Sequence, residues 1–387
     1  MKSKKLLVNL LLLLGTFLFS LLLLEVGFRL FSPRGVTKSR IDPDLGWVHV
    51  PNCRYVFHHR EFNTPISYNS FGMRDTEHTL AKPPGVFRIA VLGDSYMEGR
   101  QVVLDSVYSK VLERLLREKG INCETLNFGV HGYGTDQELV VLRKSALRFD
   151  PDLVILSLNK NDIATNVVGG ICSLDSEGKL KITPLGAPLA SRIRAWLYRN
   201  SHLFTFLNIR LPNLMSAGAR KRSHRRMYDV GDLDMWGDFN RTQQDLDRNL
   251  VPLYAKVEDP RVVPVKRLTE AILREVHHLC QQRDVKFLLL LNSSKFQLQP
   301  QFWERKFNSF GLDSEDYNPE AVEKWLLEFA AKEGFPVLSA VQPFRGLKAQ
   351  RGISFHWKID GHWNPNGHRE AARLTVEVLD SLGLPPS

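Results

Sequence analysis

Short apolar runs alternate with helical patterns from Phe87 to the end of the chain, and this alternation limits the possible folds more than any other feature. Each run has the length and composition of a buried strand. The run at 153–158 is almost entirely apolar, as a strand must be when helices cover both faces of its sheet. We therefore predict an α/β fold with a parallel sheet and right-handed crossovers. The predicted strands are Phe87–Leu92, Cys123–Asn127, Leu153–Leu158, Val285–Leu291 and Phe335–Leu338.

The segments between these strands carry helix signals. Thr135 and Glu138 have the spacing of a capping box, in which each side chain bonds the backbone at the other's position. Asn318 followed by Pro319 is a typical N-cap and first helical residue. The predicted helices are Ser106–Lys119, Thr135–Phe149, Val265–Arg283, one that begins at Asn318 and ends before Gly334, and one at about 366–382.

The N-terminal stretch Leu6–Leu24 is apolar and uncharged. At about 1.5 Å per residue it is just long enough to cross a hydrocarbon core of roughly 30 Å. Lysines at positions 2, 4 and 5 favour a cytoplasmic N-terminus and an extracytoplasmic, periplasmic location for the rest of the chain, although basic residues from Arg29 to Arg40 weaken that preference. A cleaved signal peptide is the alternative, but no small-x-small cleavage site follows. We predict a retained single-pass membrane anchor.

Composition divides the chain into three parts. Residues 1–31 form the predicted anchor, 32–85 a proline-containing linker and extended arm, and 86–387 the main domain, with a helical insertion at about 167–260. The insertion contains the basic cluster Arg220–Arg226, which is either a solvated loop or a contact for anionic headgroups or an acidic glycan. Trp236, Phe239 and Tyr254 could cover a ligand, but packing is the favoured interpretation.

The formal net charge of +10 suits either nucleic acid or an anionic membrane surface. The apolar N-terminal stretch favours the membrane, so we predict no nucleic-acid partner. Four cysteines, at positions 53, 123, 172 and 280, have neither CxxC nor metal-ligand spacing. We interpret them as buried thiols, although an oxidising compartment would permit a disulfide that the sequence cannot pair.

Polar blocks follow three of the predicted strands, and a fourth block precedes the last helix. Because a parallel sheet brings such loops to one edge, residues far apart in the sequence can meet there. A serine hydroxyl is a weak nucleophile that needs a base nearby, and an acid–histidine pair can supply one whatever the chain order. The four blocks are Gly93-Asp94-Ser95, Asn127-Phe128-Gly129-Val130-His131-Gly132, Asn159-Lys160-Asn161-Asp162 and Asp360-Gly361-His362.

Together these blocks resemble the SGNH/GDSL hydrolase family, over Phe87 to about Leu382 without the insertion. The arm sequence at 69–75 and the leading apolar stretch resemble a membrane-bound bacterial branch of that family. The resemblance implies a flavodoxin-like three-layer α/β/α fold and a Ser95 nucleophile. His362 would take the serine proton and Asp360 would orient the imidazole. The backbone N–H groups of Ser95 and Gly132 and the Asn161 side-chain amide would form the oxyanion hole, and no metal or organic cofactor is implied.

The sequence departs from the family pattern in two places. The usual Asp-x-x-His is replaced by Asp360-Gly361-His362, followed by Trp363. A similar Asp-x-His-Trp occurs in relatives that act on polysaccharide acetyl groups. The glycine of the usual Gly-x-Asn-Asp block is replaced by Asn159, which alters the loop backbone but leaves Asn161 in place. The Gly-x-Ser-x-Gly elbow is absent, which argues against the α/β-hydrolase fold.

Each site residue also has a purely structural interpretation. Ser95 could cap a helix, His362 could be a core histidine, and Asn161 could be an ordinary turn residue. His356 and His368 are rival bases, but only His362 carries the motif. Asp94 and Asp162 are predicted to be structural, and we predict no role for His131.

The sequence favours a serine esterase that acts through an acyl-enzyme on a carboxylic ester, with an O-acetyl group on a cell-envelope glycan or an acylated lipid as candidate substrates. An O-acyltransferase with the same triad is the nearest alternative, because a sugar hydroxyl could intercept the acyl-enzyme instead of water. A catalytically silent glycan-binding module is a third hypothesis.

Overall fold

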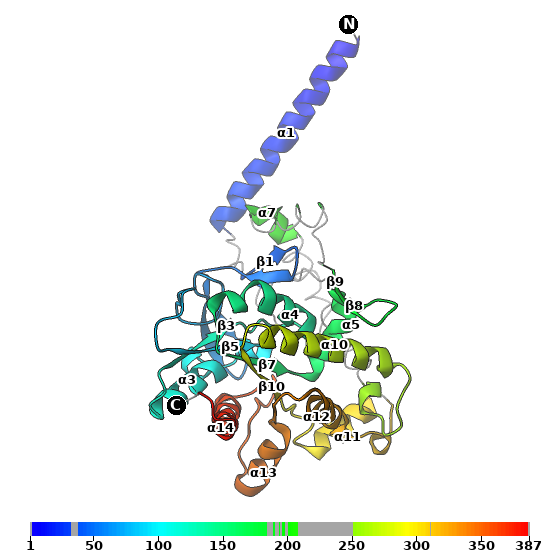
Figure 1. Cartoon of the computed structure of the whole chain (residues 1–387). Coiled ribbons are helices and arrows are strands. Elements are labelled where there is room, and N and C mark those ends of the chain that lie inside the picture. Colours follow the sequence, from blue (N-terminus) through cyan, green and yellow to red (C-terminus); the bar gives the residue numbers. More distant parts are fainter. Residues whose placement is uncertain are drawn as a thin grey trace.

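Five parallel strands form the central sheet, in the order β11-β10-β7-β5-β6 (Figure 1). In chain order this arrangement is 2-1-3-4-5, the flavodoxin-like strand order. The predicted parallel α/β sheet is therefore confirmed, and two of its strands differ from prediction only at their ends. The strands are β5 (Phe87–Leu92), β6 (Cys123–Asn127), β7 (Leu153–Leu158), β10 (Lys286–Leu291) and β11 (Val337–Ser339).

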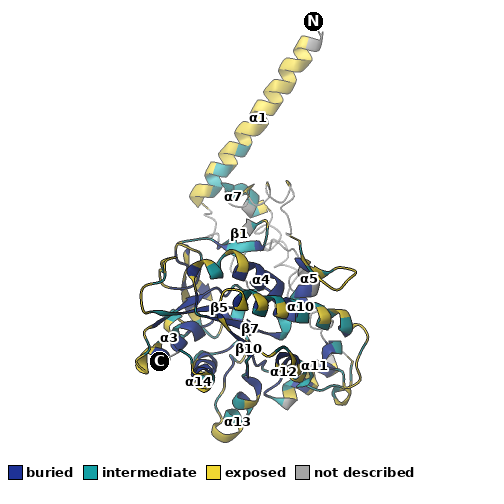
Figure 2. Ribbon diagram, in the orientation of Figure 1, coloured by how far each residue is buried: buried dark blue, intermediate teal, exposed yellow. Residues whose placement is uncertain are grey.

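The computed structural model describes residues 2–31, 38–183, 189, 193, 196–197, 200–207, 251–309 and 311–385. Side chains alternate between the two faces of each strand, so each face has its own core. In β5, Ala90 and Leu92 belong to one core, whereas Ile89 and Val91 belong to the other. The strands are buried on both faces (Figure 2).

Helices cover both faces of the sheet and confirm the three-layer architecture. The first core is closed by α4 (Thr135–Lys144), α5 (Lys160–Gly169) and α10 (Val262–Gln281), and α11 (Pro300–Ser309) and α12 (Ala321–Glu333) add to it. The second core is closed by α3 (Tyr108–Glu118), α13 (Val341–Arg351) and α14 (Pro365–Ser381). Single turns of 3-10 helix lie at Leu104–Ser106, Ala146–Phe149, Val251–Tyr254 and Ser314–Asp316.

Two predicted helix caps are wrong, although α4 begins at Thr135 as predicted, and α3 and α10 begin two residues later and three residues earlier than predicted. Gly134, not Thr135, is the N-cap of α4, and the Gly134 N–H donates to Gln137 Oε1 at 3.1 Å. Glu138 is buried one turn into the helix instead of closing a capping box. The helix predicted to begin at Asn318 begins at Ala321, because Asn318 Oδ1 accepts the Glu320 N–H in a preceding turn. The helices α5, α11 and α13 were not predicted.

Helix α1 (Lys2–Phe31) projects away from the domain with most of its described side chains exposed (Figures 1 and 2). Its stretch Lys4–Phe31 is the one helix in the described part of the chain that is long and apolar enough to cross a membrane. The arm that follows forms two antiparallel hairpins. These are β1 (Ser39–Asp42) with β2 (Gly46–His49), and β3 (Arg54–His58) with β4 (Asn63–Ser67).

The described part of the predicted insertion contains both strands and helix. A small hairpin joins β8 (Cys172–Leu174) to β9 (Leu180–Ile182), and α7 (His202–Thr205) lies beside α1 (Figure 1). Tyr254 is buried against Phe296 and Trp303, in keeping with the packing interpretation. The cluster Arg220–Arg226, with Trp236 and Phe239, lies outside the described residues. All four cysteines are buried, in keeping with their interpretation as buried thiols.

Candidate active site

The turn after β5 is built so that Ser95 opens a short helix. A Cβ at Gly93 would lie 2.5 Å from Met97 Cγ and 3.0 Å from Ser157 Cβ, so only glycine fits there. Asp94 caps α2 (Ser95–Glu98), and its Oδ1 accepts the Tyr96 N–H at 2.9 Å. The turn ends β5, which has β6 on one side and β7 on the other. The chain order of the strands reverses at β5 and β7, and α/β sheets commonly bind ligands at such a point.

His362 connects Ser95 to Asp360. Ser95 Oγ lies 2.8 Å from His362 Nε2, and His362 Nδ1 lies 2.6 Å from Asp360 Oδ1. Because a carboxylate only accepts, Nδ1 carries the proton in the neutral ring and Nε2 accepts from the serine hydroxyl. The structure therefore brings together all three residues of the predicted triad, from the two ends of the domain.

The Asp-x-His spacing works because the intervening residue turns sharply. Gly361 has φ +90°, and Asp360 Oδ1 also accepts the backbone N–H of His362 at 3.1 Å. Trp363 is fully buried next to this turn, and its Nε1–H donates to Ser293 Oγ at 3.2 Å. The short motif thus binds the carboxylate to both the ring and the backbone of His362.

The opposite charges of Asp360 and His362 shift the pKa values of both groups. Burial alone would raise the pKa of Asp360, but the neighbouring His362 holds it well below its usual range. Burial likewise lowers the pKa of His362, but the charge and hydrogen bond of Asp360 outweigh burial and raise it above the ordinary value. The His362 side chain remains 27% exposed, so the site is open to a ligand.

The three predicted oxyanion donors are free to bind. The Ser95 N–H is in the first turn of α2, and the Asn161 side chain is on the second residue of α5. Gly132 adopts φ +77° in the loop after β6, which is tied to the Gly93 carbonyl by the Val130 N–H at 3.0 Å. Within the part of the chain that the structure describes, neither these two N–H groups nor the Asn161 amide has a hydrogen-bond partner.

Asn159 replaces the family's glycine without strain. It is the N-cap of α5 at φ −112°, an extended conformation open to any residue, and its N–H donates to Asp162 Oδ2 at 2.5 Å. The lost glycine therefore does not displace Asn161 from the start of the helix.

The rival histidines are engaged elsewhere. His356 Nε2 lies 2.9 Å from the Ser293 carbonyl, and burial lowers the pKa of His356 to about 4. His368 Nδ1 accepts the Tyr108 N–H at 3.2 Å, and burial lowers the pKa of His368 to about 3. Neither ring is placed to serve Ser95.

Residues 91–370, well over half of the chain, match the GDSL-like Lipase/Acylhydrolase family. The chain belongs to this family. It is therefore an ester-hydrolysing enzyme of the GDSL-like group, as the four sequence blocks predicted. No curated protein matches this acylhydrolase in a sequence comparison.

Several solved structures are similar to this acylhydrolase. The crystal structure of TesA has 13% identity and a TM-score of 0.38, over 76% of this chain and 99% of that one. An acetyl xylan esterase has 11% identity and a TM-score of 0.39, over 76% and 99%. The lipase/acylhydrolase from Enterococcus faecalis has 14% identity and a TM-score of 0.38, over 76% and 96%.

The arm of this acylhydrolase reaches the triad, which the sequence did not reveal. Glu61, at the tip of the β3–β4 hairpin, accepts the backbone N–H groups of Lys358, Ile359 and Asp360 at 2.7, 2.8 and 2.8 Å. The neighbouring Phe62 ring packs 5.2 Å from that of Trp357. The carboxylate of Glu61 therefore holds the backbone that carries the triad aspartate.

Glu98 makes a second connection between arm and site. It is fully buried and accepts from Tyr68 Oη at 2.7 Å, from the His131 N–H at 2.8 Å and from His131 Nδ1 at 2.9 Å. His49 Nε2 lies 3.3 Å away and Arg100 Nε 3.6 Å away. Burial alone would raise the pKa of Glu98, but Arg100 and the two imidazoles hold it well below its usual range. His131, for which no role was predicted, thus helps fix the loop before Gly132.

The same residues are the candidate cation ligands among those described. His49, Glu98 and His131 each place one ligand atom within 4.8 Å of the others. The contacts of Glu98 with the two imidazoles and with the Arg100 cation explain the arrangement without an ion, and we assign no metal to these residues.

Four buried carboxyl groups lie beneath the nucleophile turn. Burial raises the pKa of Asp94 to about 6 and that of Asp136 to about 6. Burial, reinforced by the charge of Asp94, also raises the pKa values of Glu138 and Asp162 well above the usual range. These residues support the turn and the start of α5, in agreement with the structural roles predicted for Asp94 and Asp162.

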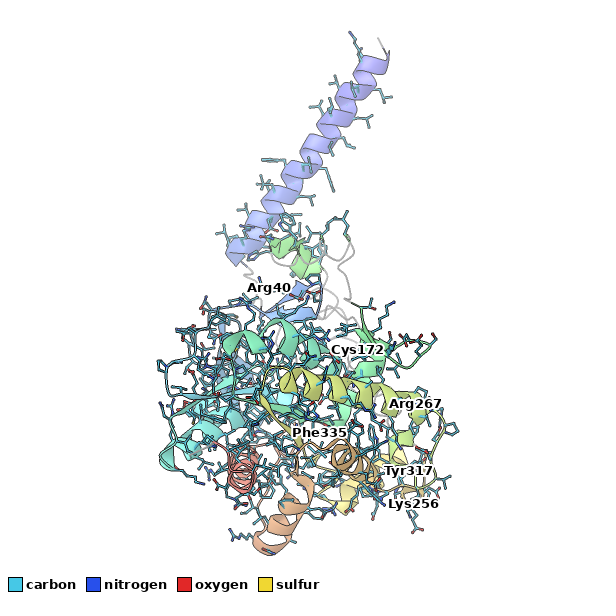
Figure 3. The ribbon with its side chains drawn as sticks, viewed as in Figure 1. Arg40, Cys172, Lys256, Arg267, Tyr317 and Phe335 are labelled. Atoms are coloured by element: carbon cyan, nitrogen blue, oxygen red, sulfur yellow. The ribbon has the colours of Figure 1, made fainter. Side chains whose placement is uncertain are left out.

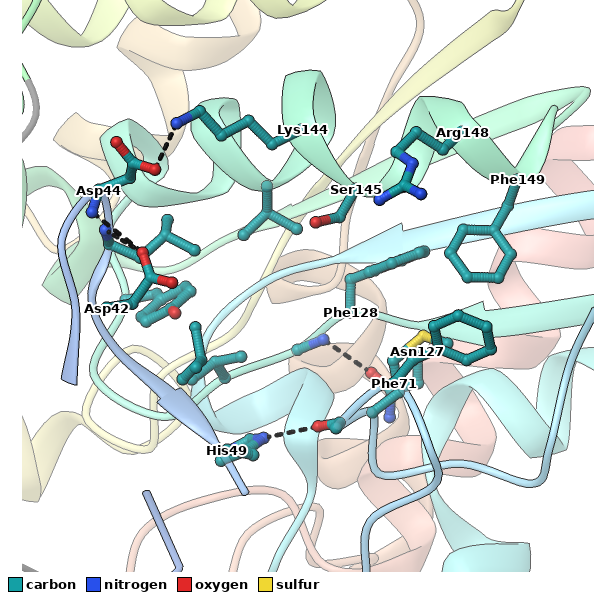
Figure 4. A pocket seen from close by; sticks show the side chains of 18 of the residues that line it. Asp42, Asp44, His49, Phe71, Asn127, Phe128, Lys144, Ser145, Arg148 and Phe149 are labelled. Atoms are coloured by element: carbon teal, nitrogen blue, oxygen red, sulfur yellow. Dashed lines mark hydrogen bonds and ion pairs between the residues drawn. The ribbon is translucent and has the colours of Figure 1, made fainter. Parts of the chain in front are cut away.

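A separate cavity of about 270 Å³ lies between the arm and the end of α4 (Figure 4). Phe71, Phe128 and Phe149 give it an apolar wall, and Lys144 at its edge pairs with Asp44. Neither Ser95 nor His362 lines this cavity, so the chemistry of the proposed triad does not take place in it.

Proposed function

We propose that this acylhydrolase is a membrane-anchored serine esterase that removes an acyl group through an acyl-enzyme at Ser95. The observation that carries the proposal is the continuous hydrogen-bonded path from Ser95 Oγ through His362 to Asp360. A hydroxyl becomes a competent nucleophile when a positioned base can take its proton.

In the first half-reaction, Ser95 Oγ attacks the ester carbonyl carbon while His362 Nε2 takes the hydroxyl proton. The negative charge that develops on the carbonyl oxygen would be bound by the N–H groups of Ser95 and Gly132 and by Asn161. Each such donor typically contributes about 3 kcal/mol to transition-state stabilisation. His362 then gives its proton to the leaving alkoxide, and the acyl group remains on Ser95.

In the second half-reaction, a water molecule repeats the attack on the acyl-enzyme. His362 takes a proton from this water and gives it to Ser95 Oγ as the bond between Ser95 and the acyl group breaks and the carboxylic acid leaves. Asp360 keeps its negative charge throughout and stabilises the imidazolium that forms twice in the cycle. The pair therefore needs no cofactor for proton transfer.

We further propose that the substrate is an O-acetyl ester on a cell-envelope glycan. The Asp-x-His-Trp sequence at 360–363 resembles that of relatives that act on polysaccharide acetyl groups. The exposed edge of His362 is compatible with a bulky polymer substrate that cannot enter a closed pocket. The lysines before α1 favour a periplasmic domain, where such glycans are found.

Full-length protein in detergent, assayed with p-nitrophenyl acetate, tests the nucleophile. Ser95→Ala should lower kcat/KM at least about a thousandfold, since only binding and the oxyanion donors remain. Ser176→Ala, an exposed serine in the β8–β9 turn, is the matched control and should change nothing. Undiminished turnover by a folded Ser95→Ala protein would rule out this mechanism.

The substrate is tested with O-acetylated envelope polysaccharides. Acetate release that depends on Ser95 supports the glycan esterase. Acetyl transfer to an added glycan, with little free acetate, would instead identify the acyltransferase.

A further inference from the structure

The end of α1 is bonded to the insertion. The Glu25 carboxylate accepts from Ser201 Oγ at 2.8 Å and from the N–H groups of His202 and Leu203 at 2.9 and 3.0 Å. Arg29 also donates to Glu25, at 2.8 Å. The Glu25 carboxylate, which directly follows the apolar run, thus accepts its hydrogen bonds from residues at the start of α7.

Two further contacts reinforce this junction. Arg29 Nη2 donates to the Asn200 carbonyl at 2.9 Å, and the rings of Phe28 and Phe206 lie 4.3 Å apart. Hydrogen bonds and ring packing therefore join α1 to residues 200–206 over more than one turn of α1. Such a joint is expected of a helix that stays with the folded protein, and not of a cleaved signal.

The junction lies at a defined depth. The uncharged stretch Leu6–Leu24 matches the thickness of a hydrocarbon core at about 1.5 Å per residue. If that stretch fills the core, Glu25 and Arg29 lie at the headgroup level. Because α7 packs against these residues, it lies at the same level, beside the end of α1 nearest the domain (Figure 1).

Residues next to this junction expose large apolar side chains. The exposed fractions are 70% for Leu189, 50% for Ile193, 56% for Trp196 and 47% for Leu207. Leu189, Ile193 and Trp196 are each in helical conformation, and they are four and three residues apart in the sequence. Exposing these large apolar side chains to water is unfavourable, whereas exposed tryptophan and leucine side chains are typical of a segment at a membrane surface.

The charge of this stretch fits the same environment. Its sequence carries Arg192, Arg194 and Arg199 among the apolar residues and no acidic residue from 189 to 207. Arginine close to a membrane surface is attracted to anionic lipid headgroups by roughly 1 kcal/mol per residue.

We propose that the described residues of this stretch (189, 193, 196–197 and 200–207) form a second membrane contact, which lies on an anionic bilayer surface and is held to the anchor by Glu25. The proposal rests on the proposed insertion of α1 into the membrane. It gives the insertion a function: two attachments fix the orientation of the domain over the bilayer, whereas a single helix followed by a linker would leave the domain free to turn.

Spin labels on single cysteines test this in nanodiscs of phosphatidylglycerol and phosphatidylcholine. The native cysteines are buried, so introduced ones should label selectively. Trp196→Cys reports the proposed contact, Leu13→Cys the middle of α1, and Val257→Cys is the control. Val257 is apolar and 84% exposed, and its neighbour Lys256 lies at the end of the molecule away from α1 (Figure 3).

The measured quantity is the ratio of a spin label's collision rate with oxygen, which concentrates in lipid, to its collision rate with a water-soluble nickel reagent. This ratio should be several-fold higher for a label at position 196 than for a label at position 257. Adding Glu25→Ala should move the value at 196 toward that at 257, whereas adding Leu22→Ala, an exposed residue on the same helix, should not. Equal aqueous values at 196 and 257, with position 13 in the bilayer, would overturn the proposal. Aqueous values at position 13 would instead overturn the anchor, and neither result bears on the esterase chemistry.

Discussion

Glu61→Ala tests whether the arm positions the triad. The change removes the carboxylate that accepts three successive N–H groups, those of residues 358–360, at 2.7 to 2.8 Å. Hydrogen bonds to a charged group typically contribute about 1.5–3 kcal/mol each. Glu61 is only half-buried, and water can replace it at the freed N–H groups, so we expect a total loss of about 1 to 2 kcal/mol.

Most of that loss should affect catalysis, because the released backbone carries Asp360. A loss of about 1.4 kcal/mol in the transition state is tenfold in rate, so we expect kcat to fall about 5- to 30-fold with little change in KM. Glu61→Gln keeps one acceptor oxygen and should fall between wild type and Glu61→Ala. Arg60→Ala, an exposed neighbour on the same hairpin tip, is the matched control.

The assay is steady-state hydrolysis of p-nitrophenyl acetate between pH 5 and 9, with circular dichroism to check folding. A structural effect alone would lower activity equally at every pH. Loss of positioning should also move the acid limb of kcat/KM to lower pH, because Asp360 no longer holds the charged imidazole as well. Wild-type kcat and an unmoved limb in Glu61→Ala would refute the reasoning.

Three further predictions concern the site and its support. Asp360 raises the pKa of His362, and only the neutral imidazole can accept the serine proton, so kcat/KM should rise with pH through a pKa above 6.5. In a pH–rate profile, Asp360→Asn should lower the rate and move this acid limb to lower pH. Burial raises the pKa of Asp136 from 3.8 to about 6, so the folded protein binds this proton more tightly than the unfolded chain does. The resulting contribution to the free energy of unfolding, up to about 3 kcal/mol, is present at low pH and is lost as pH rises from 4 to 6. Urea unfolding of Asp136→Asn should therefore show a smaller loss of stability over that range than wild type, and parallel curves would contradict the assignment. A Cβ at Gly129 would lie 2.4 Å from the backbone N of Glu98, so Gly129→Ala should shift the nucleophile turn and reduce activity and melting temperature together, whereas wild-type behaviour in both measurements would count against this packing.

The sheet was predictable because most of its strands are short and largely apolar. Three of the five strands, β5, β6 and β7, have the predicted ends, and Gly93 and Asn159 directly follow β5 and β7. Helix starts were harder, because several residues near each start can cap it. At α4 the backbone placed Gly134 at the cap although Thr135 has the better capping side chain.

The triad residues were predictable from motifs, but the contacts that support them were not. Ser95, His362 and Asp360 each stand in a block whose position at a strand end or before the last helix is visible in the sequence. Glu61 and Glu98 act through partners distant in the sequence, and no local pattern marks such a contact. The two arm hairpins escaped prediction for a similar reason, since their strands are short and gain much of their burial from the domain beneath.

The most direct test of the account is mass spectrometry of the full-length protein after reaction with a fluorophosphonate. Ser95 Oγ should displace fluoride from phosphorus while His362 takes the proton, which leaves one phosphonyl group on the peptide that contains Ser95. His362→Ala should slow this labelling greatly. Ester hydrolysis that continues without an adduct on Ser95, or with the adduct on another residue, would contradict the central claim.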